Sequence, residues 1–202
     1  MAGDAAGARE ALAQGLSIAM ELGAEWRALS VRMYFAVALL VEGATAEAET
    51  MVRPAVEGLQ RMGDHTLLAS ASALLAEALW RAARADEAML ATVLSEGVTA
   101  EDDLAAGMAW RGVRAKILAD RGEVKEAVAL ARAAAELGAN SEFLLFAGWA
   151  FEDLAYVLDI AGKPDEARAA RDEARTLYER KGSRASLAHL EHDPRTAAGH
   201  AS

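Results

Sequence analysis

Cysteine is absent from this chain of 202 residues, which excludes disulfide bonds, thiolate catalysis and cysteine-based zinc sites. Basic residues are also scarce, since 21 lysines and arginines stand against 31 aspartates and glutamates and leave a formal net charge of −10. A phosphate backbone or an anionic membrane surface would repel such a chain. We therefore expect neither nucleic acid nor a membrane as a partner, and the lack of cysteine fits a cytoplasmic location.

Long hydrophobic runs are missing as well. The two longest runs, residues 33–41 and 143–151, hold nine residues each, whereas a membrane-spanning helix needs about 20. The first residues carry neither the basic segment nor the apolar segment of a secretory signal. The sequence therefore predicts a protein that neither crosses a membrane nor is secreted.

The sequence also lacks the motifs of common enzymes. It contains no phosphate-binding loop with Lys-Ser/Thr, no Gly-x-Gly-x-x-Gly and no Gly-x-Ser-x-Gly. The acidic run 101–103 fits the start of a helix, where the helix dipole favours negative charge, and His189 and His192 fit a solvated surface. We expect no catalytic residue, no metal and no cofactor, and we predict that the chain is not an enzyme.

What is present is a chain rich in helix-forming residues with a regular repeat. Apolar residues make up 53% of the sequence and only three prolines occur, so long helices are expected. Four Glu-Ala pairs recur at almost equal intervals, and an alanine and a leucine precede each pair at constant distances. The alanines of these pairs are Ala48, Ala88, Ala127 and Ala167, the preceding alanines are Ala36, Ala76, Ala115 and Ala155, and the leucines are Leu39, Leu79, Leu118 and Leu158. Self-similarity with a period of about 40 predicts a helical solenoid.

The columns and the glycines between them predict helix hairpins. Two antiparallel helices approach closely only where both present small side chains. We therefore expect the two alanines of each unit to lie opposite each other where its helices cross. Gly43, Gly122 and Gly162 lie five residues before the second alanine, where a glycine can end a helix in left-handed geometry. The second unit has Ala83 at this place, so its turn fits the pattern least well.

These signals give a map of the chain. We predict one repeat domain over residues 1–192 and a flexible tail over 193–202. The domain comprises a leading helix at 5–22, four units at 25–62, 65–96, 101–137 and 142–181, and a terminal helix at 183–191. Second helices are expected to end near Gly97 and Gly138, and Thr99 with Asp102 is expected to form a capping box at the start of the third unit. Most of the four tryptophans are expected in the core.

The repeat resembles the tetratricopeptide (TPR) family, which has small residues at the closest contact of its two helices and a glycine at the turn. The match is fullest in the fourth unit, at Phe151, Leu154, Ala155, Leu158, Gly162, Ala167 and Ala174. Arg111 and Arg114 depart from the pattern in the third unit, where the family prefers apolar residues. The resemblance implies an all-α, right-handed α-solenoid of antiparallel helix hairpins, a TPR-like superhelix.

The length of the period resembles that of the longer repeats found C-terminal in bacterial signalling ATPases, nucleotide-cyclase-type regulators and transcription regulators. This implies a protein–protein interaction scaffold within a larger regulator, and the alternative is a free-standing adaptor that binds a partner peptide in its concave groove. Self-association through an exposed N-terminal end is a further expectation. The groove residues that the family geometry implies are Met33, Val37, Glu77, Trp80, Arg81, Lys116, Tyr156 and Asp159.

Overall fold

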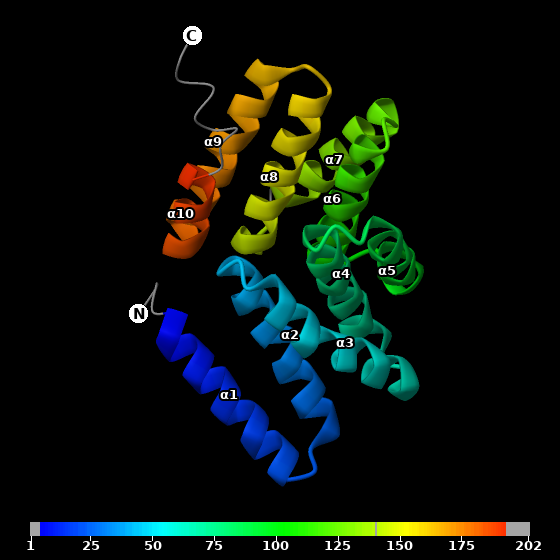
Figure 1. Cartoon of the computed structure of the whole chain (residues 1–202), viewed down its shortest axis with the longest axis vertical. Helices are drawn as coiled ribbons and strands as arrows, with labels where there is room; N and C mark the ends of the chain where they lie inside the picture. The colour runs from blue at the N-terminus through cyan, green and yellow to red at the C-terminus, as the bar shows by residue number, and fades with distance from the viewer. Residues whose placement is uncertain (1–4, 140, 193–202) are drawn as a thin grey trace. The chain divides into compact units, whose positions relative to one another are not determined.

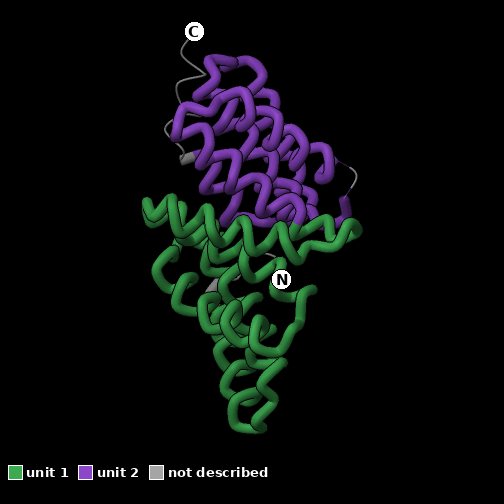
Figure 2. The backbone as a smooth tube through the Cα atoms, turned by 90° about the vertical axis from the view of Figure 1, so that its right-hand side faces the viewer, with its two compact units in different colours: residues 1, 3–106 green, residues 2, 107–202 purple. Residues whose placement is uncertain are grey.

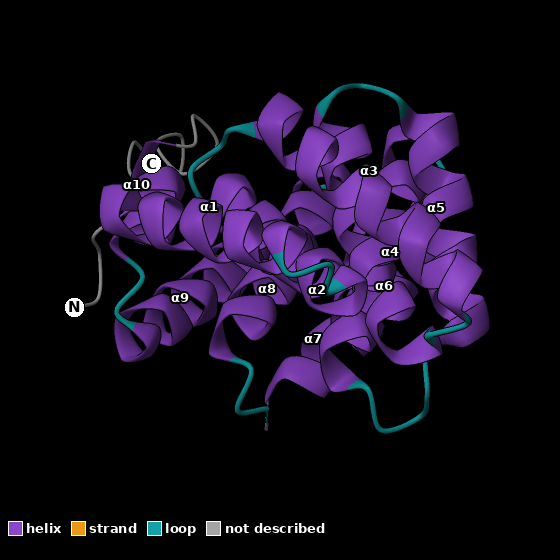
Figure 3. Ribbon diagram, turned by 90° about the horizontal axis from the view of Figure 1, so that it is seen from below, coloured by secondary structure: helices purple, strands orange, loops and turns teal. Residues whose placement is uncertain are grey.

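The computed structural model describes residues 5–139 and 141–192 (Figure 1). Within these ranges the chain forms α-helices joined by short loops and contains no strand (Figure 3). The helices are α1 (Ala5–Glu21), α2 (Glu25–Val41), α3 (Thr45–Met62), α4 (His65–Arg81), α5 (Ala85–Val98), α6 (Leu104–Asp120), α7 (Val124–Ala139), α8 (Leu144–Ile160), α9 (Pro164–Lys181) and α10 (Arg184–His192). The tail predicted at 193–202 lies outside the described residues. None of the described helices is both long and apolar enough to span a bilayer.

The helices belong to two compact units (Figure 2). The first unit holds α1 to α5 and the start of α6 as far as Ala106, and the second unit begins at Gly107 and holds the rest of α6 with α7 to α10. In the first unit α2 packs on α3 and α4 packs on α5; in the second unit α8 packs on α9 as an antiparallel pair (Figure 1). The expected all-α fold of antiparallel helix hairpins is confirmed.

Burial of the repeat columns explains why the hairpins form. All eight column alanines are at most 1% exposed, and the four column leucines are at most 7% exposed. In the last hairpin Ala155 and Leu158 of α8 share one buried cluster with Ala167 and Ala170 of α9. Small side chains therefore meet at this crossing as predicted, while each buried leucine stabilises the fold by roughly 1.5–3 kcal/mol.

The leucine column has a second role, because its carbonyl groups close the turns. The N–H of Ala44 donates to the carbonyl of Leu39 at 2.8 Å, and the N–H of Lys163 donates to the carbonyl of Leu158 at 2.9 Å. This bond is the outer bond of a Schellman motif, which requires a left-handed residue just before the donor. Gly43 supplies that residue with a φ of +77°. The fixed distance from leucine to turn is therefore a backbone requirement.

Ala83 takes the same geometry without being a glycine. Its φ is +59°, and the following N–H of Arg84 donates to the carbonyl of Leu79 at 2.9 Å. A β-carbon in the left-handed region clashes with the following carbonyl and costs roughly 1–2 kcal/mol. The second hairpin therefore closes like the others but stores strain at its turn.

Replacing Ala83 with glycine is expected to stabilise the protein by about 0.5–1 kcal/mol, because relief of the strain exceeds the added flexibility of the unfolded chain. Urea denaturation checks this value. Ala82 is the matched control: it is exposed with a φ of −83°, so Ala82→Gly should destabilise by about 0.5 kcal/mol. Equal effects of the two substitutions would contradict the strain at position 83.

One local prediction was wrong. Thr99 does not cap the third unit, because its hydroxyl donates to the carbonyl of Ser95 at 2.6 Å, and Asp103 instead accepts from the N–H of Ala106 at 3.0 Å. The helices α5 and α7 end at Val98 and Ala139, one residue after Gly97 and Gly138, so both end near these glycines as expected.

The tryptophans were also predicted wrongly as a group. Trp110 is 4% exposed, whereas Trp26 is 50% exposed and uses its indole N–H to donate to Asp64 at 2.7 Å. Trp80 and Trp149 are partly buried. Core packing therefore accounts for Trp110, and the amphipathic indole ring serves partly exposed positions elsewhere.

Candidate functional site

Four of the eight predicted groove residues occupy a single position of the repeat. This position follows the crossing alanine in α2, α4, α6 and α8, which we call the first helices. Its residues are Val37, Glu77, Lys116 and Tyr156. Its place in the scaffold is the same in every hairpin, while its side chain differs from one hairpin to the next. Solenoids build their binding surfaces from positions of this kind. Because the chain divides into two units, the structure is described for each unit separately.

In the first unit, Arg81 ties the end of α4 to the end of α2. Its Nε lies 2.6 Å from Oε1 of Glu77, and its Nη1 donates to the carbonyl of Leu40 at 2.8 Å. Glu77 is 7% exposed and Arg81 is partly buried. The guanidinium thus satisfies a carbonyl at a helix C-terminus, where positive charge is favourable.

The other candidates of the first unit differ in access. Met33 on α2 is 5% exposed and belongs to the core. Val37, one helical turn further on, is partly buried, and so is Trp80 on α4. These two side chains therefore supply the accessible apolar surface of the predicted set in this unit.

In the second unit, a buried ion pair joins α6 to α8. Nζ of Lys116 lies 2.7 Å from Oδ1 of Asp153, with side-chain exposures of 4% and 13%. Gly112 makes room for the carboxylate, since a Cβ added there would stand 2.1 Å from Oδ2 of Asp153. At this depth the attraction is strong, but the pair must also overcome a large desolvation cost.

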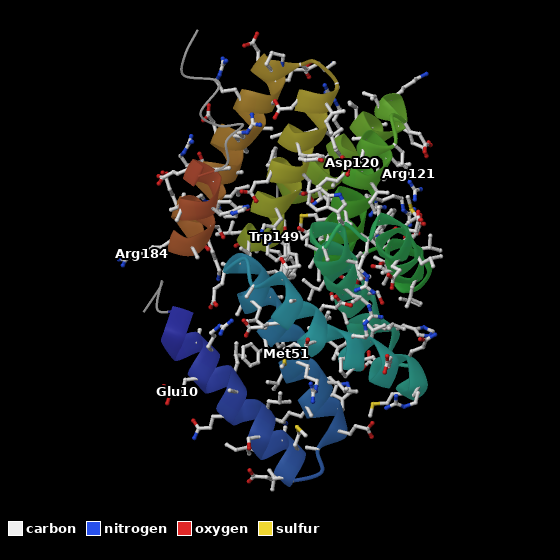
Figure 4. All side chains as sticks on the ribbon, viewed as in Figure 1. Glu10, Met51, Asp120, Arg121, Trp149 and Arg184 are labelled. Atoms are coloured by element: carbon white, nitrogen blue, oxygen red, sulfur yellow. The ribbon has the colours of Figure 1, made fainter. Side chains whose placement is uncertain are left out.

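The remaining candidates of the second unit are the α8 residues Tyr156 and Asp159. The hydroxyl of Tyr156 donates to Oδ1 of Asp120 at 2.6 Å, and Asp120 is labelled at the end of α6 in Figure 4. Asp159 forms an ion pair with Arg171 of α9, whose residue exposure is 8%. Tyr156 and Asp159 are both partly buried, so each combines a structural contact with an accessible surface.

Sequence reasoning missed the partners of these residues, namely Asp153, Asp120 and Arg171. One of them carried a signal. Asp153 stands at the repeat position of Leu74 and Val113, which are 1% and 2% exposed. Tyr34, at the same position of α2, is 57% exposed. A carboxylate at a position that is buried and apolar in the two preceding hairpins requires a cation, and Lys116 supplies it.

The ion pairs of α3 with the start of α5, in the first unit, are more exposed to solvent than the pair of Lys116 with Asp153. Arg84 bonds to Glu87 and to Glu49, and Arg53 also bonds to Glu49. The Arg84 guanidinium lowers the pKa of Glu87, while hydrogen bonds from Arg53 and then Arg84 lower the pKa of Glu49. Such solvated pairs contribute little to stability, and what they contribute is lost as pH falls through the lowered pKa values.

No group of three or more His, Cys, Asp or Glu side chains that could hold a metal ion occurs among residues 5–139 and 141–192.

Comparison with known proteins gives a fold and no family membership. No protein-family model matches the chain, and no curated protein matches it. Solved structures do match. One is BtubC from P. vanneervenii, with 16% identity, 98% of this chain and 93% of that chain covered, and a TM-score of 0.59.

A second similar structure is a protein of Podosopora anserina with nearly identical TPR-like repeats of the kinesin-light-chain type. It has 20% identity, 89% of each chain covered and a TM-score of 0.57. Identities this low are evidence of the fold alone. The expected TPR-like solenoid fold is therefore confirmed.

Proposed function

We propose that the chain is a non-enzymatic protein–protein interaction scaffold whose first helices bind a partner peptide or a neighbouring domain. The observation that carries this proposal is a first-helix face that keeps an aromatic side chain partly exposed in each unit, Trp80 on α4 and Tyr156 on α8. Solenoids of this fold expose such faces for recognition.

The burial of the candidates divides their roles. Met33, Glu77 and Lys116 are buried, so they pack beneath the surface of the first helices and stabilise it. Val37, Trp80, Arg81, Tyr156 and Asp159 are partly exposed and offer aromatic, apolar and charged contacts. Aromatic and arginine side chains dominate binding energy at protein interfaces, so Trp80 in the first unit and Tyr156 in the second are the residues on which we expect binding to depend.

We further propose that the scaffold acts as the C-terminal repeat part of a larger bacterial signalling regulator. Support comes from the long repeat period, which resembles that of the repeats in bacterial signalling ATPases and nucleotide-cyclase-type regulators. The alternative is a free-standing cytoplasmic adaptor. The reading frame upstream of Met1 separates the two: an in-frame nucleotide-binding or cyclase module supports the regulator, and a stop codon with independent expression supports the adaptor.

Selection from a random peptide library on the purified chain tests the binding face. Peptides that bind are then titrated against Trp80→Ala and Tyr156→Ala, after thermal melting has shown that both variants are folded. At least one variant should lose about tenfold or more in affinity for a given peptide, as expected for a hot-spot aromatic residue.

Val93 is the matched control for this experiment. It is 53% exposed on the second helix α5, so Val93→Ala should leave the affinity unchanged. Peptides whose binding is lost with Val93→Ala but unaffected by Trp80→Ala and Tyr156→Ala would place recognition on the second helices and overturn the proposal.

A further inference from the structure

Trp149 of α8 is a large side chain at a repeat position that is small in the other first helices. It stands six residues before the crossing alanine Ala155, and the equivalent residues are Ser30, Ser70 and Ala109. All four residues at this position are partly buried. Because three hairpins form without a ring here, the packing of the repeat does not by itself require Trp149.

Trp149 shares a helix face with Tyr156, the residue on which we expect binding in the second unit to depend. The two residues are seven positions apart, which is two helical turns. One turn before Trp149, the ring of Phe146 meets the indole ring edge to face, with centroids 5.3 Å apart and planes at 76°. Both rings are partly buried, and Trp149 is labelled on α8 in Figure 4. We call Phe146 and Trp149 the aromatic corner.

The chain does not use the ring of Trp149 for a cation of its own. Trp110 of the same unit carries two, since the guanidinium groups of Arg111 and Arg114 lie 4.3 and 4.5 Å from its ring centroid. Trp149 has no cation over its ring and no hydrogen bond from its indole N–H within residues 5–139 and 141–192. Its ring is therefore available for a cation from outside the chain.

We infer that the aromatic corner binds the cationic side chain of a lysine or arginine in the partner peptide. The inference rests on the proposed function, because the corner extends the first-helix face that contains Tyr156. The face of an aromatic ring carries negative potential and attracts a cation, and two rings at a steep angle attract it from two sides.

Charge on α8 favours the same occupant. Residues 144–160 contain three carboxylates and no lysine, arginine or histidine. Two of these carboxylates pair with cations of neighbouring helices. The third, Glu152, stands one turn after Trp149 and accepts from the hydroxyl of Tyr178 at 2.8 Å, a neutral donor that does not cancel its charge. A lysine or arginine at the corner is therefore attracted, whereas an acidic side chain is repelled.

The test uses peptides selected from a random library on the Trp80→Ala chain, in which the aromatic anchor of the first unit is absent. These peptides should carry a lysine or arginine. Acetyl-lysine or citrulline in its place removes the charge at similar length and should weaken binding by about three- to thirtyfold. Trp149→Leu keeps an apolar side chain but removes the ring, so it should weaken binding of the charged peptide by a similar factor.

A double-mutant cycle joins the two changes. If the cation lies on the ring, Trp149→Leu should have little further effect on the neutral peptide. Trp149→Phe keeps an aromatic face and should retain part of the affinity. Phe143→Leu is the matched control, because Phe143 is 52% exposed at the N-cap of the same helix, six residues before Trp149 and on another side; binding should be unchanged. Thermal melting first shows that all variants are folded.

The outcomes separate this inference from the proposed function. Peptides weakened by Tyr156→Ala but bound equally well after Trp149→Leu would overturn the inference and leave the first-helix face standing. Equal losses of the charged and the neutral peptide on Trp149→Leu would also overturn it, because the ring then supplies only apolar contact. Peptides weakened by neither Tyr156→Ala nor Trp149→Leu would count against both, since recognition would then lie away from this face.

Discussion

Replacing Lys116 with methionine is expected to lower the free energy of unfolding by about 3–5 kcal/mol. The substitution keeps the length of the side chain but removes the ammonium group that lies 2.7 Å from Asp153. The carboxylate would then stand beside Gly112 with a side-chain exposure of 13% and without this cation. Most of the expected loss is therefore the cost of a buried carboxylate that has lost this ammonium group.

Thermal and urea unfolding measure this loss, which corresponds to a fall in melting temperature of roughly 6–20 °C for a chain of this size. Lys125→Met is the matched control on the exposed start of α7 and should change stability by less than about 0.5 kcal/mol. The double variant Lys116→Met/Asp153→Leu should recover most of the loss, since an apolar pair of similar volume replaces the buried ions. A double variant as unstable as the sum of its two single variants would show that the two side chains do not interact.

The repeat could be predicted because it rests on backbone geometry. Alanine at the crossings allows two helix axes to approach, and the leucine carbonyl closes each Schellman turn, so both requirements recur at every unit. Ala83 shows how strong this requirement is: its turn closes with the same hydrogen bonds although the residue is unsuited to a φ of +59°. The repeat period and the residues at the turns were therefore enough to predict the fold.

Side-chain partners could not be predicted in the same way. Arg168 and Arg175 each have an acidic residue three positions earlier and another four positions later, and they pair with the earlier ones, Asp165 and Asp172. Both spacings lie on one helix face with nearly equal energies, so rotamer choice decides. For Lys116, Tyr156 and Asp159 the partners lie on other helices. The groove role of the eight candidates stays a prediction.

In two neighbouring hairpins, α6/α7 and α8/α9, a large and a small side chain that touch each other exchange places. Met108 of α6 is 0% exposed, and Gly138 of α7 lies against it, since a Cβ added at Gly138 would stand 3.3 Å from its sulfur. At the equivalent positions of the next hairpin the sizes are reversed: the first helix has Gly148 and the second helix has Tyr178, which is 0% exposed. A close-packed interior requires this compensation. The repeat register gives the equivalence of the two pairs, but only the structure shows that the two residues of each pair touch.

Gly148→Ala is therefore expected to destabilise the protein by about 2 kcal/mol or more, although alanine is the better helix former by about 1 kcal/mol. The new Cβ would stand 2.2 Å from Cε1 and 2.7 Å from Cζ of Tyr178. The ring cannot easily move away, because its hydroxyl donates to Oε2 of Glu152 at 2.8 Å and the side chain is fully buried. Overpacking thus outweighs helix propensity at this position.

Gly15→Ala is the matched control for helix propensity. It places the same methyl group in the middle of α1, where nothing lies within 4 Å, and should stabilise the protein by about 0.5–1 kcal/mol. Opposite signs of the two substitutions in urea unfolding are the expected result. Tyr178→Leu removes the ring edge, so adding Gly148→Ala to that variant should cost less than adding it to the unaltered chain. If Gly148→Ala instead stabilises the protein as Gly15→Ala does, Tyr178 does not fill the space beside Gly148. The exchange of large and small residues between hairpins would then not explain how this core is packed.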